Sequence, residues 1–185
     1  MSFFQKTFAL FILILCIPIF FIVTILIFLE DSRPILFKQL RVGKENTEFL
    51  IIKFRTMYQD SPNVASEDLK TPDKFILKSG KILRKLSIDE LPNLINIIKG
   101  EMNFIGPRPA LPSQIELNTK REQQGIHLLK PGITGWAQIN GRDEIPIDEK
   151  VELDLYYLEN KSLLLDAKII LKTIFKVFKS SNISH

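Results

Sequence analysis

Two adjacent carboxylates, Asp89 and Glu90, are the side chains best suited to chemistry in this sequence of 185 residues. They stand in the segment SIDELP (87–92), whose proline predicts where a helix begins, because proline breaks a helix interior but is favoured in the first turn. The free amide groups at a helix start favour anions, including ionised carboxylates and phosphate groups. Neighbouring residues on a helix point about 100° apart, so the two carboxylates face different directions.

A structural explanation of the same pair stays open. Ser87 and Glu90 have the spacing of a capping box, in which the two side chains satisfy free amide groups at a helix start. Acidic residues are also common in first turns because they complement the helix dipole. Under this interpretation the pair stabilises the helix and does no chemistry.

Arginines and tight turns gather in the same part of the sequence. Six of the eight glycines and six of the ten prolines fall between residues 92 and 146, which is typical of rigid turns where the backbone approaches a small molecule. A planar guanidinium offers a fork of donors suited to phosphate. Four of the seven arginines are candidates for such a contact, in or near this region or on a predicted strand: Arg55, Arg84, Arg108 and Arg142.

Turn and periodicity signals predict the elements that hold these residues. Strands are expected at 35–42 and 47–56 around a turn at 43–46. The polar stretch 58–72 is expected to form a loop. Helices are predicted at 75–86, 89–99, 111–124, 148–160 and 164–180.

The N-terminal residues predict a membrane segment. Lys6 is the only charged residue before Glu30, so 23 uncharged residues run from Thr7 to Leu29, more than the roughly 18 that indicate a membrane helix. The run is too long for the apolar part of a signal peptide, and large side chains stand where cleavage would need small ones. Pro18 lies at its midpoint and predicts a kink. A kinked spanning helix and a hairpin that enters and leaves by one face both remain open.

The remainder of the chain reads as a water-facing domain with a basic helix near its end. From Glu30 onward there are 24 basic and 21 acidic residues. Lys168, Lys172 and Lys176 recur every four residues and form one stripe on the last predicted helix. Such a helix suits the headgroup region of an anionic membrane, or it is an ordinary surface helix that packs its apolar side on the core.

Composition excludes several classes of protein and site. With 45% apolar and 25% charged residues the chain is not a disordered tail. One cysteine and two histidines exclude a disulfide framework, a cysteine-based zinc cluster and a multi-histidine metal site. Any metal ion should therefore be a hard cation held by carboxylate oxygens.

Four separated motifs follow the membrane segment in order: KFRTM (53–57), LRKLSIDELPNL (83–94), GEMNFIGPRP (100–109) and KPGITGWAQINGR (130–142). Together with a membrane segment centred on Pro18, they closely resemble the bacterial monotopic phosphoglycosyl transferases, which are initiating sugar transferases of glycoconjugate and polysaccharide assembly. The resemblance covers about residues 3–180 and is to the small form of that family.

The resemblance implies a reaction and a cofactor. The aspartate of the family's acidic pair is the nucleophile, so Asp89 would attack the β-phosphorus of a UDP-sugar, release UMP and carry the sugar phosphate. Polyprenol (undecaprenyl) phosphate would then take over the sugar phosphate, which makes the reaction ping-pong. Glu90 would hold Mg²⁺, the expected cofactor, which offsets charge on phosphate oxygens.

The resemblance also assigns the basic residues. Arg84 and Arg108 match arginines expected to contact phosphate. Lys53, Arg55 and Arg142 match basic positions of the other motifs and are expected to bind substrate, with Arg142 on the nucleotide side.

The resemblance implies a topology as well. The membrane helix would be re-entrant and broken near Pro18, with both ends on the cytoplasmic side of the inner membrane. The expected fold is α+β and mainly helical: a re-entrant membrane helix at 1–29, then a cytoplasmic, membrane-associated catalytic domain at 30–185 with a short β-hairpin and several short and interfacial helices. The expected partners are a UDP-sugar, polyprenol phosphate and membrane lipids, and no nucleic acid. The sugar, the pathway and the oligomeric state are left open.

Two other functions use the same features. A membrane-anchored, Mg²⁺-dependent diphosphatase would keep the carboxylates but use water as the acceptor. A non-catalytic, membrane-anchored interaction protein would use the acidic pair only as a helix cap, and Asp89→Ala would then cost about 1 kcal/mol of stability.

Overall fold

A computed structural model describes residues 2–59, 61, 74–141 and 145–181. These residues are mainly helical and carry one short antiparallel hairpin sheet, in agreement with the predicted class. They form two compact units. The first draws on the chain up to Gln39, on Ile52–Ile98 and on the chain from Val177, and the second comprises Leu40–Ile51 and Lys99–Lys176. The predicted division after residue 29 concerns the membrane and stays a prediction.

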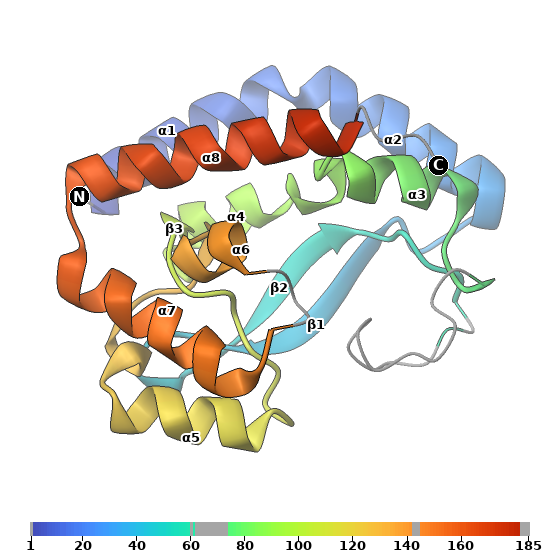
Figure 1. Ribbon diagram of the computed structural model, residues 1–185. Helices are drawn as coiled ribbons and strands as arrows, with labels where there is room; N and C mark the ends of the chain where they lie inside the picture. The colour runs from blue at the N-terminus through green and yellow to red at the C-terminus, as the bar shows by residue number, and fades with distance from the viewer. Residues whose placement is uncertain (1, 60, 62–73, 142–144, 182–185) are drawn as a thin grey trace. The chain divides into compact units, whose positions relative to one another are not determined.

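The first unit begins with two helices, α1 (Ser2–Leu15) and α2 (Ile17–Asp31). They are bent by 59° at the break between them, and Figure 1 shows the resulting arch. Pro18 stands in the first turn of α2. Because proline has no amide hydrogen, the carbonyl of Ile14 loses its helix partner and the helix bends there. The predicted kink is confirmed.

The two helices expose much of their apolar surface. Within the described residues, no single helix is long and apolar enough to cross a membrane, and α1 and α2 meet that test only together, as a bent pair. Phe3 at 85% and Leu29 at 76% are among the most exposed of their large side chains. An apolar surface of this extent is typical of a protein that contacts lipid or another protein.

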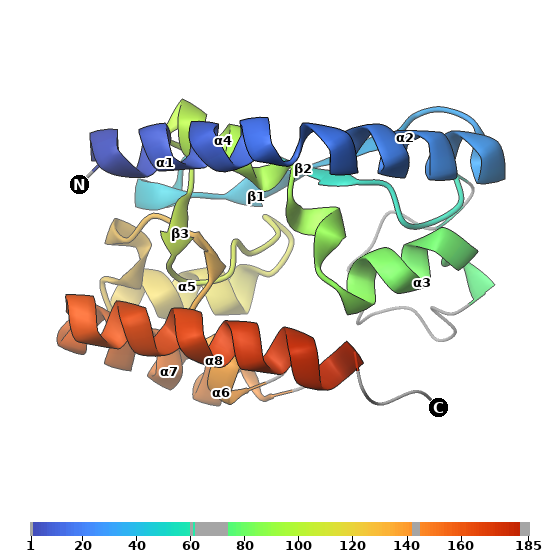
Figure 2. The same cartoon turned by 90° about the horizontal axis from the view of Figure 1, so that it is seen from above.

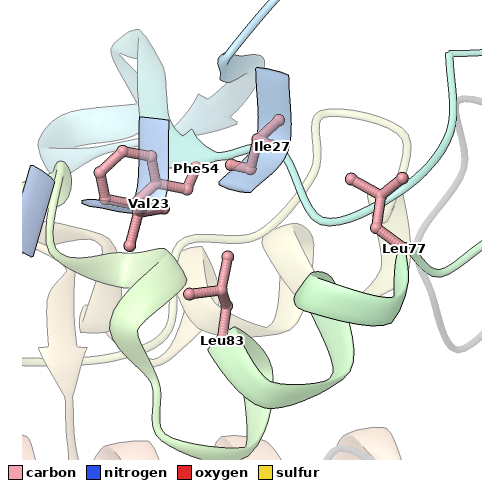
Figure 3. Close-up of a cluster of buried hydrophobic side chains, with 5 residues drawn as sticks. All are labelled: Val23, Ile27, Phe54, Leu77 and Leu83. Atoms are coloured by element: carbon pink, nitrogen blue, oxygen red, sulfur yellow. The ribbon is translucent and has the colours of Figure 1, made fainter. Parts of the chain in front are cut away.

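One side of α2 is buried within the first unit. Val23 and Ile27 are 3% and 0% exposed and pack with Phe54, Leu77 and Leu83 in one apolar cluster. Figure 3 shows these five side chains converging. The cluster joins α2 to the end of the second hairpin strand and to α3 (Lys78–Lys85). Phe54 and Leu83 are chain neighbours of basic residues expected at the site, so the packing of α2 helps to place those residues.

The hairpin consists of β1 (Leu36–Val42) and β2 (Glu48–Phe54), which confirms the two predicted strands. Its connection holds a 3₁₀ turn, η1 (Lys44–Asn46), in which Glu45 and Asn46 have positive φ. Left-handed residues are common in hairpin connections because they follow the twist of the strands. Of the loop predicted at 58–72, only residues 58, 59 and 61 lie within the described residues.

Two short helical segments stand where one helix was predicted at 89–99. A 3₁₀ turn, η4, covers Ile88–Glu90, and the α-helix α4 spans Asn93–Lys99. The amide of Leu91 bonds three residues back, at 3.1 Å, as in a 3₁₀ turn. Pro92 has no amide hydrogen to make the next bond, so a regular α-helix starts only after it. Figure 2 shows this connection between α3 and α4.

The second unit contains a parallel pair of strands that was not predicted. β3 (Asn103–Ile105) pairs with β4 (Gly132–Thr134), with Asn103 opposite Gly132 and Ile105 opposite Thr134. Strands of three residues are too short to show an alternating pattern. Their pairing also joins segments that lie far apart in the sequence.

The other helices of the second unit are α5 (Ile115–Gln123), η5 (Ile126–Leu128), α6 (Trp136–Asn140), α7 (Ile147–Asn160) and the part of α8 (Leu163–Ser181) up to Lys176. The three helices predicted in this part of the chain correspond to α5, α7 and α8, although α5 starts four residues later than predicted. α5 and α7 lie side by side (Figure 1). One apolar cluster fills the space between them and η5: Ala110, Leu117, Ile126 and Val151. A second cluster joins α7 to α8: Tyr157, Leu165 and Ile169.

The lysine stripe of α8 contacts α6. The ammonium nitrogens of Lys168 and Lys172 lie 5.3 and 5.4 Å from the centre of the Trp136 ring, and Lys176 donates to the carbonyl of Gln138 at 2.7 Å. Several large apolar side chains of α8 are exposed: Leu163, Leu164, Ile170, Leu171, Ile174 and Phe175. The helix thus turns its lysines toward the protein and leaves an apolar face exposed.

Candidate active site

The acidic pair lies at a sharp corner of the first unit. α3 ends at Lys85, and Ser87 then adopts a left-handed backbone conformation with φ 54° and ψ 21°. This conformation costs about 1–2 kcal/mol for a residue with a side chain. The side chain of Ser87 makes no capping hydrogen bond, so the capping-box interpretation does not hold. Left-handed conformations at residues with a side chain are common at active sites.

Two cations accompany the two carboxylates. The ammonium nitrogen of Lys53, in β2, lies 2.5 Å from Oε1 of Glu90, and the two side chains are only 16% and 19% exposed. The charge of Arg84, in the last turn of α3, acts on Asp89. The structure therefore brings together four of the residues predicted from the sequence, and all four belong to the first unit.

The carboxyl group of Asp89 has a strongly altered affinity for protons. Burial, with a further contribution from the negative charge of Glu90, raises its pKa from 3.8 to about 6. The positive charges of Lys53 and Arg84 act in the opposite direction. A carboxylate of this pKa is mostly ionised between pH 7 and 8 and is more basic than an ordinary aspartate. A shift of this size beside specific charge partners is typical of functional sites.

Arg84 is held in place by Thr56, a residue to which no role was assigned from the sequence. Oγ1 of Thr56 accepts a hydrogen bond from Nε of Arg84 at 2.8 Å, and Thr56 is only 6% exposed. The carbonyl of Thr56 accepts from the amide of Leu77 at 3.0 Å. Gly80 of α3 packs so closely that a Cβ there would lie 2.3 Å from that carbonyl oxygen. The signals available in the sequence were the place of Thr56 inside the motif at 53–57 and a glycine inside a predicted helix.

Thr56→Val is expected to lower turnover by about ten- to a hundredfold, because valine has the shape of threonine but no oxygen to orient Arg84. Thr56→Ser keeps the oxygen and is expected to retain most of the activity. The measurement is kcat and KM for both variants, together with their thermal midpoints. Equal activity of the valine and serine variants would show that Thr56 does not orient Arg84.

Arg55 makes its contacts elsewhere in the first unit. Its guanidinium pairs with the carboxylate of Asp31 and donates to the backbone carbonyls of Asp31 at 2.7 Å and of Ser32 at 3.1 Å. The side chain is 6% exposed. Arg55 thus closes the C-terminal end of α2, where carbonyls lack helical partners and a positive charge is favourable. A substrate contact by Arg55 stays a prediction, and it would require the guanidinium to leave these partners.

The remaining predicted residues are not part of this cluster. Arg108 belongs to the second unit, where it stands between the buried Pro107 and Pro109 and lines a cavity of about 30 Å³. Arg142 lies outside the described residues. The substrate contacts expected of Arg108 and Arg142 stay predictions.

Asp89 and Glu90 suit Mg²⁺ better than a metal ion that protein side chains surround completely. Among the residues that the structure describes, no three His, Cys, Asp or Glu side chains gather around one point. Mg²⁺ usually keeps several water molecules and is bound through one or two carboxylates together with substrate phosphates. Asp89 and Glu90 provide oxygen ligands of that kind and number, so the residues present fit the expected ion.

Comparison with known proteins identifies the family. A family model described as "Bacterial sugar transferase" matches residues 1–180. The chain belongs to this family. The match confirms the resemblance found in the four motifs, and it includes the N-terminal helices of the first unit.

Several relatives in the family are similar over most of this chain. It is 43% identical over 182 residues to the "Uncharacterized sugar transferase EpsL" of Bacillus subtilis, covering 97% of this chain and 88% of the relative. It is 40% identical over 162 residues to the UDP-N-acetylgalactosamine-undecaprenyl-phosphate N-acetylgalactosaminephosphotransferase of Aeromonas hydrophila, with 85% and 38% covered. The UDP-glucose:undecaprenyl-phosphate glucose-1-phosphate transferase of Escherichia coli is 35% identical over 175 residues, with 90% and 38% covered. The chain therefore matches most of one relative and well under half of the other two.

Proposed function

We propose that this chain transfers a sugar 1-phosphate from a UDP-sugar to a membrane polyprenol phosphate through a phosphoaspartate at Asp89. The observation that carries the proposal is the corner after Ser87, where the partly buried Asp89, its pKa raised to about 6, lies within reach of the charges of Glu90, Lys53 and Arg84. Relatives over most of the chain are named for undecaprenyl-phosphate sugar phosphotransfer. The product would begin the assembly of a glycoconjugate or polysaccharide.

The first half-reaction is a displacement at phosphorus. A carboxylate oxygen of Asp89 forms a bond to the β-phosphorus of the UDP-sugar, the bond from that phosphorus to the bridging oxygen breaks, and UMP leaves. A carboxylate attacks an anionic diphosphate poorly because like charges repel. Arg84 and Lys53 place positive charge next to the acidic pair and oppose that repulsion.

In the second half-reaction Asp89 is the leaving group and polyprenol phosphate is the attacking group. An oxygen of polyprenol phosphate forms a bond to the phosphorus held on Asp89, and the bond from phosphorus to the aspartate oxygen breaks. The product is a polyprenyl diphosphosugar, and Asp89 is regenerated as a carboxylate. No general base is needed for the attacking groups, because the carboxylate and the lipid phosphate are both already ionised near neutral pH.

Magnesium is the proposed cofactor, with Glu90 as the residue that holds it. When bound, Mg²⁺ would offset negative charge on the phosphate oxygens. Lys53 pairs with Glu90 at 2.5 Å. Its positive charge thus balances Glu90 and fixes the direction of that side chain.

Glu90→Gln is expected to raise the Mg²⁺ concentration for half-maximal turnover by about tenfold or more, since an amide is a weaker ligand for a hard cation than a carboxylate. Removing the metal with EDTA should stop turnover of the parent protein. Initial rates over a Mg²⁺ titration measure both effects, with Glu48→Gln, an exposed residue of β2, as the control. An unchanged Mg²⁺ requirement in Glu90→Gln would remove Glu90 from the metal site.

We further propose that the exposed apolar surface of α1 and α2 lies in the cytoplasmic leaflet of the inner membrane and that the bend at Pro18 returns the chain to the cytoplasmic face. The support is the 59° bend and the large exposed side chains on both helices. Burial of such side chains in hydrocarbon is favourable by about 25 cal/mol per Å². The exposed face of α8 has the same composition, and we assign it to the headgroup boundary.

Pro18→Ala is expected to straighten the bend and make a fraction of molecules span the membrane, because alanine restores the missing amide hydrogen. The topology can be measured with Ser2→Cys in a Cys16→Ala background, labelled from outside intact cells with a membrane-impermeant reagent. The parent should stay unlabelled, and the Pro18→Ala variant should be partly labelled. External labelling of the parent would contradict the re-entrant topology.

The decisive test of the function is incubation of the membrane-extracted protein with Mg²⁺, a panel of UDP-sugars and polyprenol phosphate. Release of UMP together with a lipid-linked diphosphosugar supports the proposal. UMP release with free sugar phosphate and no lipid product would instead show a diphosphatase. Absence of UMP with every donor would favour a non-catalytic role.

A further inference from the structure

Hydrogen bonds to every backbone carbonyl from Pro107 to Ala110 hold the segment that carries Arg108 in place. Each carbonyl accepts a hydrogen bond from a different group of the second unit. The four donors are the amide of Gly132 to Pro107 at 2.9 Å, Nη1 of Arg121 to Arg108 at 2.9 Å, Nη1 of Arg41 to Pro109 at 3.0 Å, and the amide of Val42 to Ala110 at 2.9 Å.

The two prolines make this fastening effective. Pro107 and Pro109 have no amide hydrogen and a fixed φ, and each also restricts the residue before it to extended conformations. The segment therefore has few torsional choices left once its carbonyls are held. Gly132 adds a close backbone contact, since a Cβ there would lie 2.1 Å from the amide nitrogen of Gly106.

Arg121, one of these donors, is itself held by a buried partner. Its Nε and Nη2 both bond Oδ2 of Asp154, at 3.0 and 2.6 Å, and its Nη1 bonds the carbonyl of Arg108. Arg121 and Asp154 are 7% and 1% exposed. The guanidinium fork thus links α7, through Asp154, to the backbone of Arg108.

A buried ion pair is weak evidence for a contribution to stability, because the cost of removing two charges from water largely cancels their attraction. Well-packed apolar side chains of similar volume often stabilise a fold equally well. What apolar side chains cannot do is donate a hydrogen bond to the carbonyl of Arg108. The geometry of Arg121 therefore fits a positioning role better than a stabilising one.

We infer that Arg121, held by Asp154, is a positioning residue that fixes the backbone of Arg108 so that its guanidinium is presented to substrate phosphate. The inference rests on the proposed phosphate contact of Arg108. Arg121 itself acts through the Arg108 backbone and needs no contact with substrate.

The test is the paired substitution Arg121→Met with Asp154→Leu, made in the full chain in detergent with Mg²⁺. It removes both buried charges together, so neither is left without a partner. We expect a thermal midpoint at or above that of the parent, and a kcat that is lower by about ten- to a hundredfold. Hydrogen exchange in peptides that cover residues 104–112 should become faster, whereas exchange in peptides of α7 should not.

A double-mutant cycle separates positioning from a general effect on the fold. In an Arg108→Ala background the paired substitution should change kcat by less than about twofold, because the group being positioned is absent. Tyr157→Phe is the control, since Tyr157 is buried in α7 and bonds Asp166 rather than the Arg108 segment. It should affect both backgrounds equally.

Two results would overturn the inference. One is an equal loss of kcat in the parent and Arg108→Ala backgrounds, and the other is unchanged exchange over residues 104–112. If the parent protein turned over no UDP-sugar, the proposed function would fail, and the exchange measurement would still decide whether Arg121 holds the segment.

Discussion

Asp89→Asn is expected to reduce sugar-phosphate transfer by a factor on the order of 10⁴ or more, because asparagine offers no ionised oxygen to attack phosphorus. The covalent sugar-phosphate intermediate should also be absent from this variant. Intact-protein mass spectrometry with UDP-sugar and Mg²⁺, but no lipid acceptor, should show one added sugar phosphate on the parent and none on the variant. Turnover of Asp89→Asn at the parent rate would remove Asp89 from the role of nucleophile.

The same substitution is expected to make the metal-free fold more stable at pH 8. The pKa of Asp89 is raised to about 6 in the folded chain, against roughly 3.9 in an unfolded one, so the folded state binds more protons between those values. Its stability therefore falls as the pH rises from 4 to 6, and the full cost is present above pH 7. Two pKa units correspond to at most about 3 kcal/mol.

Asparagine carries no charge at any pH, so it escapes this cost. In EDTA at pH 8 the thermal midpoint of Asp89→Asn should rise by several degrees, since about 1 kcal/mol shifts the midpoint of a chain of this size by roughly 2–4 °C. Below pH 4 the difference should disappear. Glu152→Gln, an exposed position of α7, serves as the control and should change neither midpoint nor turnover. A lower midpoint at pH 8 would show that ionised Asp89 is stabilised by its surroundings.

Arg84→Gln is expected to lower kcat/KM by about 10²–10³-fold, the typical loss when one preorganised charge or donor is removed from a site of developing negative charge. The charge of Arg84 also lowers the pKa of Asp89. Without that charge the carboxyl group should ionise at higher pH. The rise of adduct formation with pH should therefore move to higher pH in the variant.

Two further variants separate the charge of Arg84 from its geometry. Arg84→Lys keeps the charge but loses the Nε that bonds Thr56, so it should restore the pH profile of the parent with only part of the rate. Lys81→Gln removes an exposed charge one turn earlier in α3 and should leave the rate and the pH profile unchanged. An Arg84→Gln pH profile identical to that of the parent would show that Arg84 does not act on Asp89.

The features predicted from the sequence are those with local signals. The two hairpin strands, the longer helices and the bend at Pro18 follow from periodicity and from the chemistry of proline, and the structure confirms them. The acidic pair was visible because two carboxylates and a proline stand next to one another. The prediction of one continuous helix from 89 to 99 was wrong, because Pro92 ends the 3₁₀ turn before α4 begins.

The features that were missed depend on contacts between distant segments. Thr56 and Arg84 are 28 residues apart, and Arg121 and Asp154 are 33 residues apart. The motif at 53–57 and the glycine at position 80 draw attention to Thr56 without showing which side chain it supports, and nothing near Arg121 in the sequence marks it as a support. The left-handed conformation of Ser87 was equally hidden, because serine is not the residue that usually adopts it.

The buried side of α2 bears on any attempt to obtain a water-soluble form of this enzyme by deleting the N-terminal segment. Deletion of residues 1–29 would strip Val23 and Ile27 from the cluster that they share with Phe54 and Leu83. The empty space would lie directly behind the strand end and the helix that carry Lys53 and Arg84. Crystals, inhibitors or rate constants obtained with a truncated protein that stayed in solution would thus represent the intact enzyme poorly. Screening should use the full chain in detergent, nanodiscs or native membranes.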